Sequence, residues 1–445
     1  MVVPNKNKSE GENDAATNLA RLLDTSMWLL TEKVFRLFFT LLIGVMAARY
    51  LGPKDFGLFS LFFVVVSTCG ALAKLGLDDI ALKLWADKDE KLESYFGTLL
   101  FLKILGCFFG AVICICFIFI YPISDKIIYF FAGWFLVYVL QTTDLITFYY
   151  ISNKILKPLV IVNLVCFLIC LSAKCLIVIL DLGFYWFLLS FSFDAFVFGI
   201  GNIFLVRRVH VLDVSLFCKI NWQQARGFLK QGIPLGLSSI TVLLMARLDQ
   251  VMVDAFLGPD SLGQYSANLK IIEVSAFLPM VMHLVFFPDI TRARRVSMEF
   301  FRSRLVFYCR VGFAIFCLNF IVFMLFGGKA TLLLLGDEFL TASALVGISS
   351  FRLFFTFMGM PRTAFLITEG LNSHILNTSL LGLFLNLLLN FLLIPIFGLY
   401  GAIYATLLSF FLSMYVMDLV NPKVRSIVFI QFKGILTFWR VREVR

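Results

Sequence analysis

Long apolar runs recur along almost the whole chain, and they constrain its fold more than any other feature. A helix needs about 20 mostly apolar residues to cross the ~30 Å hydrocarbon core of a membrane, and twelve segments reach that length. A transmembrane barrel would show short alternating segments instead. Only 15% of the residues are charged, against about 25% in soluble domains. We therefore predict an all-α, polytopic membrane protein. Its predicted spans are 26–48, 56–73, 95–120, 127–149, 158–180, 184–205, 231–254, 264–288, 305–327, 339–360, 375–395 and 398–419.

The basic residues of the loops predict the orientation of these helices. With the N-terminus in the cytoplasm, the inner loops and termini hold 26 Lys and Arg, and the outer loops hold 4. Cytoplasmic loops of membrane proteins carry an excess of Lys and Arg. The net charge of +10 is therefore explained by topology, with no need for nucleic-acid binding, and both termini are predicted to be cytoplasmic.

A long basic loop divides the spans into two sets of six. This predicts a cytoplasmic N-terminal segment at 1–25, an N-lobe at 26–205, a cytoplasmic linker at 206–230, a C-lobe at 231–419 and a tail at 420–445. The tail is basic, amphipathic and too short to span easily. We expect it to lie in the cytoplasmic headgroup region.

A short internal repeat supports the division into halves. The segments 51–60 (LGPKDFGLFS) and 257–266 (LGPDSLGQYS) share Leu, Gly, Pro, Gly and Ser at matching positions. Each copy links the first and second span of its half, and Gly-Pro followed by Gly is typical of a helix end and a new start. Because six is even, the repeat is parallel, which favours two lobes around a central cavity that opens alternately to either face. A duplicated static bundle is the alternative.

Eight basic residues lie inside the predicted spans, where a charge costs ~2.5–3.5 kcal/mol at the bilayer centre. Such side chains face a cavity, pair with an acid or extend to the interface. Extension to the interface fits Lys174 and Arg310, which lie near span ends. For the deeper cations we predict substrate contacts in a cavity. These are Arg36, Arg247, Lys270 and Arg352.

Acidic residues accompany these cations. Glu32 lies four residues before Arg36, and Glu273 three residues after Lys270, so each pair shares a helix face. We predict Glu32 as a polar residue of the cavity. Asp249 and Glu273 are candidates for exchanging H⁺ or Na⁺ during transport, and the alternative is that each only neutralises a neighbouring cation.

Amides and helix breakers also occur within the spans. Asn386 and Asn390 are one helical turn apart, and they are candidates either for binding sugar hydroxyls in the cavity or for hydrogen bonds between helices. Pro234, Pro279 and Pro361 predict broken backbone, which is tolerated at membrane depth where it lines a cavity or is covered by protein.

Other chemistries lack support in the sequence. There is no Walker A motif, the three histidines are scattered, and the cysteines lie mostly in apolar runs without C-x-x-C spacing, so we predict no cofactor and no metal site. No segment outside the spans exceeds 26 residues, which is too short to fold a catalytic domain. A membrane polymerase or glycosyltransferase would need a large outer loop. We therefore predict a protein that is not an enzyme.

Three blocks of the sequence resemble the Wzx-type polysaccharide flippases, which share the MOP superfamily with MATE multidrug exporters and lipid II flippases. The resemblance covers roughly residues 20–420. The blocks are Trp28–Ser60, ending in ARYLGP and FGLFS; Gly232–Glu273, with GIPLGLSS, RLDQVM, LGP and GQYSA; and Asn386–Thr406, with NLLLNFLLIP and GLYGAIYAT. The chain departs from the family pattern at Ala267-Asn268, where the family has Ala-Ala, and at Lys270, where it often has Arg.

The resemblance implies a bacterial inner-membrane protein that moves an undecaprenyl-diphosphate-linked oligosaccharide, such as an O-antigen repeat unit of lipopolysaccharide, to the periplasmic leaflet. Membrane lipids, a polysaccharide polymerase, a chain-length regulator and H⁺ or Na⁺ are the implied partners. A cationic cavity suits a diphosphate. The main alternative is a MATE-type antiporter of cationic drugs, whose cargo would need unpaired carboxylates.

Overall fold

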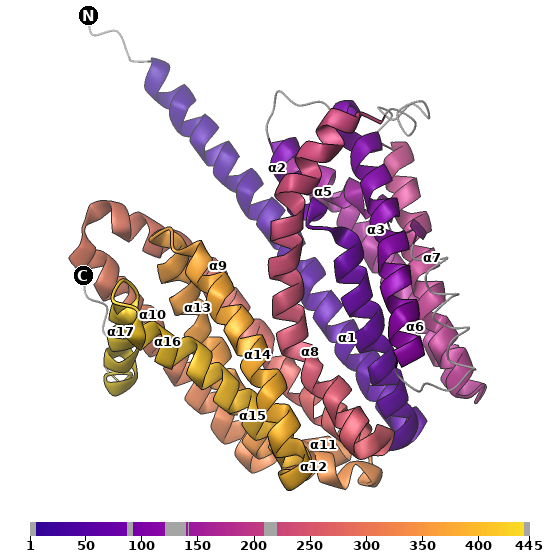
Figure 1. Cartoon of the computed structure of the whole chain (residues 1–445). Helices are drawn as coiled ribbons and strands as arrows, with labels where there is room; N and C mark the ends of the chain where they lie inside the picture. Colours follow the sequence, from indigo (N-terminus) through magenta and orange to yellow (C-terminus); the bar gives the residue numbers. More distant parts are fainter. Residues whose placement is uncertain (1–5, 87–91, 121–138, 141, 209–219, 440–445) are drawn as a thin grey trace, which may run out of the picture. The chain divides into compact units, whose positions relative to one another are not determined.

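The computed structural model describes residues 6–86, 92–120, 139–140, 142–208 and 220–439, and within them every regular element is a helix (Figure 1). The first elements are α1 (Lys6–Lys74), α2 (Leu77–Ala86), α3 (Leu92–Ile120), η1 (Thr142–Asp144), α5 (Leu145–Ser152), α6 (Leu156–Ile179) and α7 (Phe184–Arg208). They are followed by α8 (Trp222–Glu273), η3 (Val274–Ala276), α9 (Phe277–Val296), α10 (Met298–Val322), η4 (Phe323–Gly327), α11 (Gly328–Leu335), η5 (Asp337–Phe339) and α12 (Leu340–Ser349). The last are α13 (Arg352–Thr368), α14 (Asn372–Phe397), α15 (Leu399–Phe411), η6 (Leu412–Val416), α16 (Met417–Val420) and α17 (Arg425–Leu436).

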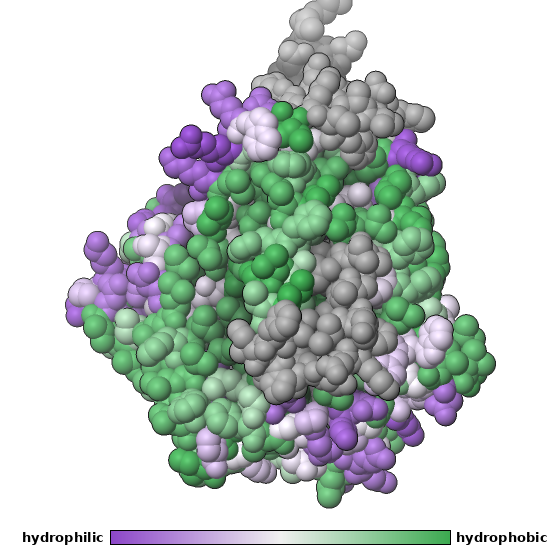
Figure 2. Space-filling view, turned by 45° about the vertical axis from the view of Figure 1, so that its right-hand side comes forward, coloured by the Kyte–Doolittle hydropathy of each residue, from purple (hydrophilic) through white to green (hydrophobic). Residues whose placement is uncertain are grey.

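The described helices confirm an all-α, multi-pass membrane protein. Eight helical stretches are long and apolar enough to cross a membrane, or nine if one bent pair counts as a span. Two of them, Thr31–Lys74 and Leu243–Val296, have 44 and 54 residues, enough for two of the predicted spans each. The predicted span 127–149 lies largely outside the described residues, so the count of twelve stays a prediction. Most of the face seen in Figure 2 is hydrophobic, with hydrophilic residues gathered in patches.

The chain forms two compact units, each described here by itself. The first unit contains residues 1–43 and 69–237, and the second contains 44–68 and 238–445. The predicted lobes divide the chain differently, because they place 231–237 in the C-lobe and 44–68 in the N-lobe. In the structure the segment 44–68 packs with the second unit, so both copies of the internal repeat belong to one unit.

The two copies of the repeat have the same backbone break. Gly52 has φ 70° and ψ 172°, and Gly258 has φ 81° and ψ 175°, a conformation that favours glycine. The later glycine of each copy touches the other copy. A Cβ on Gly57 would lie 1.8 Å from a backbone oxygen of the second copy, and one on Gly263 would lie 1.7 Å from a backbone oxygen of the first. The repeat thus forms a reciprocal contact that only glycine permits.

The predicted backbone breaks are found at one of three prolines. The helix α8 continues through Pro234; the adjacent Gly232 instead allows close approach of the Leu75 carbonyl, which a Cβ would meet at 2.6 Å. The helix α13 continues past Pro361. A break does precede Pro279, at the 3₁₀ turn η3. The prediction of a break was wrong at Pro234 and Pro361, where the helices continue.

The tail helix α17 packs one face on the second unit. Gly434 lies against Cys309 of α10, where a Cβ would come within 2.5 Å of the Cys309 Cβ. Gln431 donates a 2.8 Å hydrogen bond to the carbonyl of Met358, three residues before Pro361 in α13. The other face exposes Phe429, Phe432, Leu436 and Trp439. The location of this face in the headgroup region stays a prediction.

Candidate functional site

The helix α8 folds back on itself at Gly258, and its two limbs carry four of the nine predicted site residues. Across this turn, the Tyr265 hydroxyl donates to Asp249 and the Ser266 hydroxyl lies 3.5 Å from the Gln250 side chain. These pairs hold the limbs side by side. Asp249 and Tyr265 therefore lie side by side although 16 residues separate them in sequence, and the same holds for Gln250 and Ser266.

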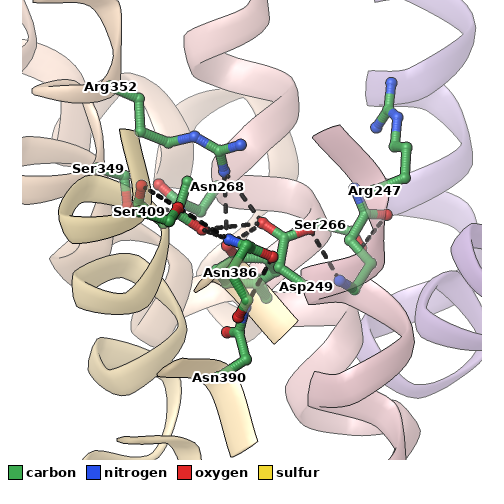
Figure 3. Close-up of polar contacts among 12 residues, drawn as sticks. Arg247, Asp249, Ser266, Asn268, Ser349, Arg352, Asn386, Asn390 and Ser409 are labelled. Carbon is green, nitrogen blue, oxygen red and sulfur yellow. Dashed lines mark hydrogen bonds and ion pairs between the residues drawn. The ribbon is translucent and has the colours of Figure 1, made fainter. Parts of the chain in front are cut away.

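A buried polar network surrounds Asp249 in the second unit (Figure 3). The Asp249 side chain is 0% exposed. Its Oδ2 accepts from the Tyr265 hydroxyl at 2.7 Å, from Arg352 Nη1 at 3.4 Å and from the Thr406 hydroxyl at 3.5 Å. Its Oδ1 accepts from the Gln250 backbone N–H at 2.9 Å. This carboxylate is therefore held by four donors, as a buried charge requires.

The two predicted asparagines belong to the same network, and both residues are 0% exposed. Asn386 Nδ2 lies 3.3 Å from the Thr406 hydroxyl and 3.4 Å from that of Ser409. Asn390 donates to Asn386 Oδ1 at 3.0 Å, while its own Oδ1 is buried without a hydrogen-bond partner. The Asn386 contacts cross from α14 to α15, whereas Asn390 bonds within α14, and neither amide reaches solvent.

A second group, the cationic cluster, consists of Arg247, Lys270 and Glu273. Arg247 Nη2 lies 3.1 Å from Glu273 Oε1, and Lys270 Nζ lies 3.7 Å from Glu273 Oε2. The side chains are 22%, 23% and 41% exposed, respectively. Two cations share one carboxylate, so the cluster carries a net charge of +1.

The cationic cluster lies far along both limbs from the turn at Gly258 and apart from the Asp249 network. Arg247 precedes Gly258 by 11 residues and Lys270 follows it by 12, which at 1.5 Å per residue is about 16–18 Å from the turn. In Figure 3 the Arg247 side chain extends away from the Asp249 network. Of the predicted cations, Arg352 belongs to that network and not to the cationic cluster.

The remaining predicted pair lies in the first unit. Arg36 Nε donates to Glu32 at 3.0 Å, and the guanidinium lies 5.7 Å from the ring centroid of Phe167. The Arg36 side chain is 57% exposed, whereas that of Glu32 is 11% exposed. This pair shares a helix face, and its cation remains accessible.

Two ionic groups in the first unit show how the structure satisfies other cations within the spans. Lys174 was expected to extend to the interface, and this was wrong. It is 0% exposed, and its Nζ lies 2.5 Å from both carboxylate oxygens of Asp194 on the neighbouring helix α7. Lys103 similarly lies between Asp78 and Asp144, at 2.6 Å and 2.5 Å. Partners on other helices make these positions structural.

A buried ion pair in the second unit was not predicted. Arg362 donates to both oxygens of Asp418, at 2.6 Å and 2.8 Å, and His374 Nε2 lies 2.7 Å from the same carboxylate. Sequence reasoning had placed Arg362 in a loop after Pro361. Continuation of α13 past that proline brings it into the bundle instead, and Asp418 inside an apolar span was the available signal.

The sequence matches the family described as polysaccharide biosynthesis protein (Polysacc_synt) over residues 22–294. The chain belongs to this family. A curated relative, the capsular polysaccharide biosynthesis protein CapF of Staphylococcus aureus, is 25% identical over 186 residues, which cover 41% of this chain and 46% of CapF. The chain thus matches less than half the length of this relative.

Two solved structures similar to this family member share its fold. The lipid II flippase MurJ in an inward closed conformation gives a TM-score of 0.63 at 13% identity, covering 93% of this chain and 92% of MurJ. An inward-facing MATE family multidrug transporter of the MOP superfamily gives 0.62 at 14% identity, covering 91% of this chain and 94% of its own. The predicted family and MOP-type fold are confirmed.

Proposed function

We propose that this protein is a flippase that moves an undecaprenyl-diphosphate-linked oligosaccharide from the cytoplasmic to the periplasmic leaflet of the bacterial inner membrane. It would act by alternating access, with both termini in the cytoplasm. The family membership supports a role in polysaccharide biosynthesis, and the fold is that of MOP transporters. The observation that carries the proposal is the cationic cluster of Arg247, Lys270 and Glu273.

The cationic cluster has the properties that an anionic lipid headgroup requires. A charge at the bilayer centre costs ~2.5–3.5 kcal/mol, and here one of two cations has no net counter-charge. A diphosphate would supply that charge. The Arg247 guanidinium offers paired N–H donors to phosphate oxygens, and Lys270 adds a compact point charge. Arg36 is an accessible cation of the first unit, and its contact with substrate stays a separate prediction.

Coupling to a gradient of H⁺ or Na⁺ is better assigned to Asp249 than to Glu273. Asp249 is buried among oxygen atoms, including that of Thr406, and the nearby Asn390 Oδ1 has no hydrogen-bond partner. Binding of a cation to this carboxylate would replace the attraction that now holds Arg352 at 3.4 Å. An ion could thereby change the packing of α13, which begins at Arg352.

The pairing of the candidate carboxylates argues against an exporter of cationic drugs. Glu32 is paired with Arg36, Asp249 with Arg352, and Glu273 with two cations. A cationic substrate would have to displace a tethered cation at each of these acids. An anionic substrate would meet cations whose charge is only partly balanced.

The proposal can be tested in proteoliposomes containing a fluorescent polyprenyl-diphosphate oligosaccharide. Purified protein is expected to make the probe in the inner leaflet accessible to an external quencher, and imposed H⁺ or Na⁺ gradients are expected to change the rate. The Asp249→Asn variant should lose the dependence on the gradient, and its thermal unfolding is measured alongside because the change also leaves Arg352 without its carboxylate. Transport of a cationic dye with no movement of the lipid probe would favour the exporter.

A further inference from the structure

We infer that Glu273 is an internal substitute for the diphosphate of the substrate: its carboxylate pairs with Arg247 and Lys270 and is displaced when the lipid headgroup binds. This inference rests on the proposed function and deepens it, because it assigns a role in affinity and release to a residue that sequence reasoning offered for ion exchange.

The contacts of Glu273 resemble those that a diphosphate would make. One carboxylate oxygen lies 3.1 Å from Arg247, and the other lies 3.7 Å from Lys270. The cations come from opposite limbs of α8, so the carboxylate bridges them. A diphosphate also presents separate anionic oxygens, with a larger total charge, and it can bridge the same two groups through charge-assisted hydrogen bonds.

Lys270 is held in place by contacts other than that with Glu273. The Lys270 side chain lies against Gly44 of α1, where a Cβ would be 3.0 Å from Lys270 Cε, and its Nζ lies 5.9 Å from the ring centroid of Phe63. Both residues belong to the same unit as Lys270. The stem of this lysine therefore has little room to move when its anion changes.

The Glu273 carboxylate, in contrast, lies where it can move away from the two cations. Its side chain is 41% exposed, about twice the exposure of either cation. It is the last residue of α8, and the 3₁₀ turn Val274–Ala276 follows it directly. A rotation of its side chain would bring the carboxylate into water at modest cost, while phosphate oxygens take over both cations. The mobile member of the cluster is thus the anion.

A tethered competitor has a measurable consequence. It weakens binding of the external anion, because the two anions exclude each other, and it speeds release, because the tethered carboxylate returns at high effective concentration. We expect Glu273→Gln to bind farnesyl diphosphate about tenfold more tightly than wild type, which corresponds to ~1.4 kcal/mol. The same variant should flip the fluorescent lipid more slowly at saturating probe.

The experiment compares binding of farnesyl diphosphate and farnesyl monophosphate to purified full-length protein in detergent. Asp289→Asn is the matched control, because Asp289 is also paired with an arginine, Arg304, and its side chain is 46% exposed. This control should bind both probes as wild type does. Glu273→Asp keeps the charge on a shorter side chain that cannot bridge both cations, and it should give an intermediate affinity.

The outcomes separate this inference from the proposed function. If wild type shows no preference for diphosphate over monophosphate, the diphosphate site itself is refuted. If wild type prefers the diphosphate and Glu273→Gln binds it equally or more weakly, only the displacement role of Glu273 is refuted. Thermal unfolding of each variant in detergent shows whether the compared proteins are folded, and Glu273→Asp provides the test should the Gln variant unfold.

Discussion

The two ionic groups carried by α8 differ in burial and in charge balance. Asp249 is 0% exposed and accepts from four donors, one of them a cation. Glu273 is 41% exposed and lies between two cations. In the Asp249 group the carboxylate is paired with one cation and buried. The Glu273 group has a net positive charge, and its side chains are partly exposed to solvent.

This difference shows how position within a span relates to role. Buried ionic groups are costly unless every charge is paired and hydrogen-bonded, so a closed network such as that of Asp249 changes only when an ion small enough to enter replaces a partner. An open cluster with unbalanced charge can accept a larger ligand from water. We therefore expect substitutions in the two groups to affect different measurements.

The largest effect is expected from Asp249→Ala. This change leaves Arg352 in a buried site without its carboxylate, and breaking a buried pair costs about 3–5 kcal/mol. The variant should unfold at a clearly lower temperature in detergent. Replacing Arg352 with Met in the same protein removes the unpaired charge and should recover part of the stability. Equal stability of the single and double variants would show that the pair is not the source of the loss.

A second buried pair tests whether burial and pairing alone mark a structural role. Lys174→Ala leaves Asp194 without its cation, and because that carboxylate is 23% exposed we expect a smaller loss of about 2–3 kcal/mol. Binding of farnesyl diphosphate should not change once the variant is folded. A loss of binding without a loss of stability would place this pair in the transport site.

The sequence predicted the all-helical membrane fold and its repeat because both depend on local patterns. Apolar length identifies spans regardless of what they touch, and the Gly-Pro motifs at Gly52 and Gly258 fix a local backbone break. The sharing of a helix face by Lys270 and Glu273 was likewise a matter of spacing. These features need no knowledge of tertiary contacts.

The partners of the charged residues could not be predicted, because they come from other helices. Lys174 pairs with Asp194, which lies 20 residues further along the chain. Asp249 pairs with Arg352, which lies 103 residues further along. Spacing within one helix carries no information about such pairs. The same limit applies to Pro361, because only the packed structure shows that α13 continues past it. The structure also shows that Gln431 of α17 donates to the carbonyl of Met358, three residues before this proline.

In the open cluster, Arg247→Ala should weaken binding of farnesyl diphosphate while leaving the melting temperature nearly unchanged. The loss of hydrogen bonds to a charged group, worth ~1.5–3 kcal/mol, corresponds to roughly 10- to 150-fold in affinity. Arg247→Lys should retain part of the affinity, since the charge remains but the paired donors do not. Arg304→Ala, at the partly exposed pair with Asp289, is the control and should bind normally. Normal binding by Arg247→Ala would mean that this arginine only balances Glu273.

The smallest expected effect is that of Thr406→Val, which tests how closed the Asp249 network is. The Thr406 hydroxyl lies 3.5 Å from Asp249 Oδ2 and 3.3 Å from Asn386 Nδ2, so both contacts are long. Valine keeps the shape and removes the hydroxyl, and the expected loss is about 0.5–1.5 kcal/mol of stability. If Asp249 binds the coupling ion, the same change removes one of the oxygen atoms nearest to it. The ion concentration that gives half-maximal flipping in proteoliposomes should then rise, with binding of farnesyl diphosphate unchanged. A shift in diphosphate binding with no shift in ion dependence would reverse the roles assigned to the two groups.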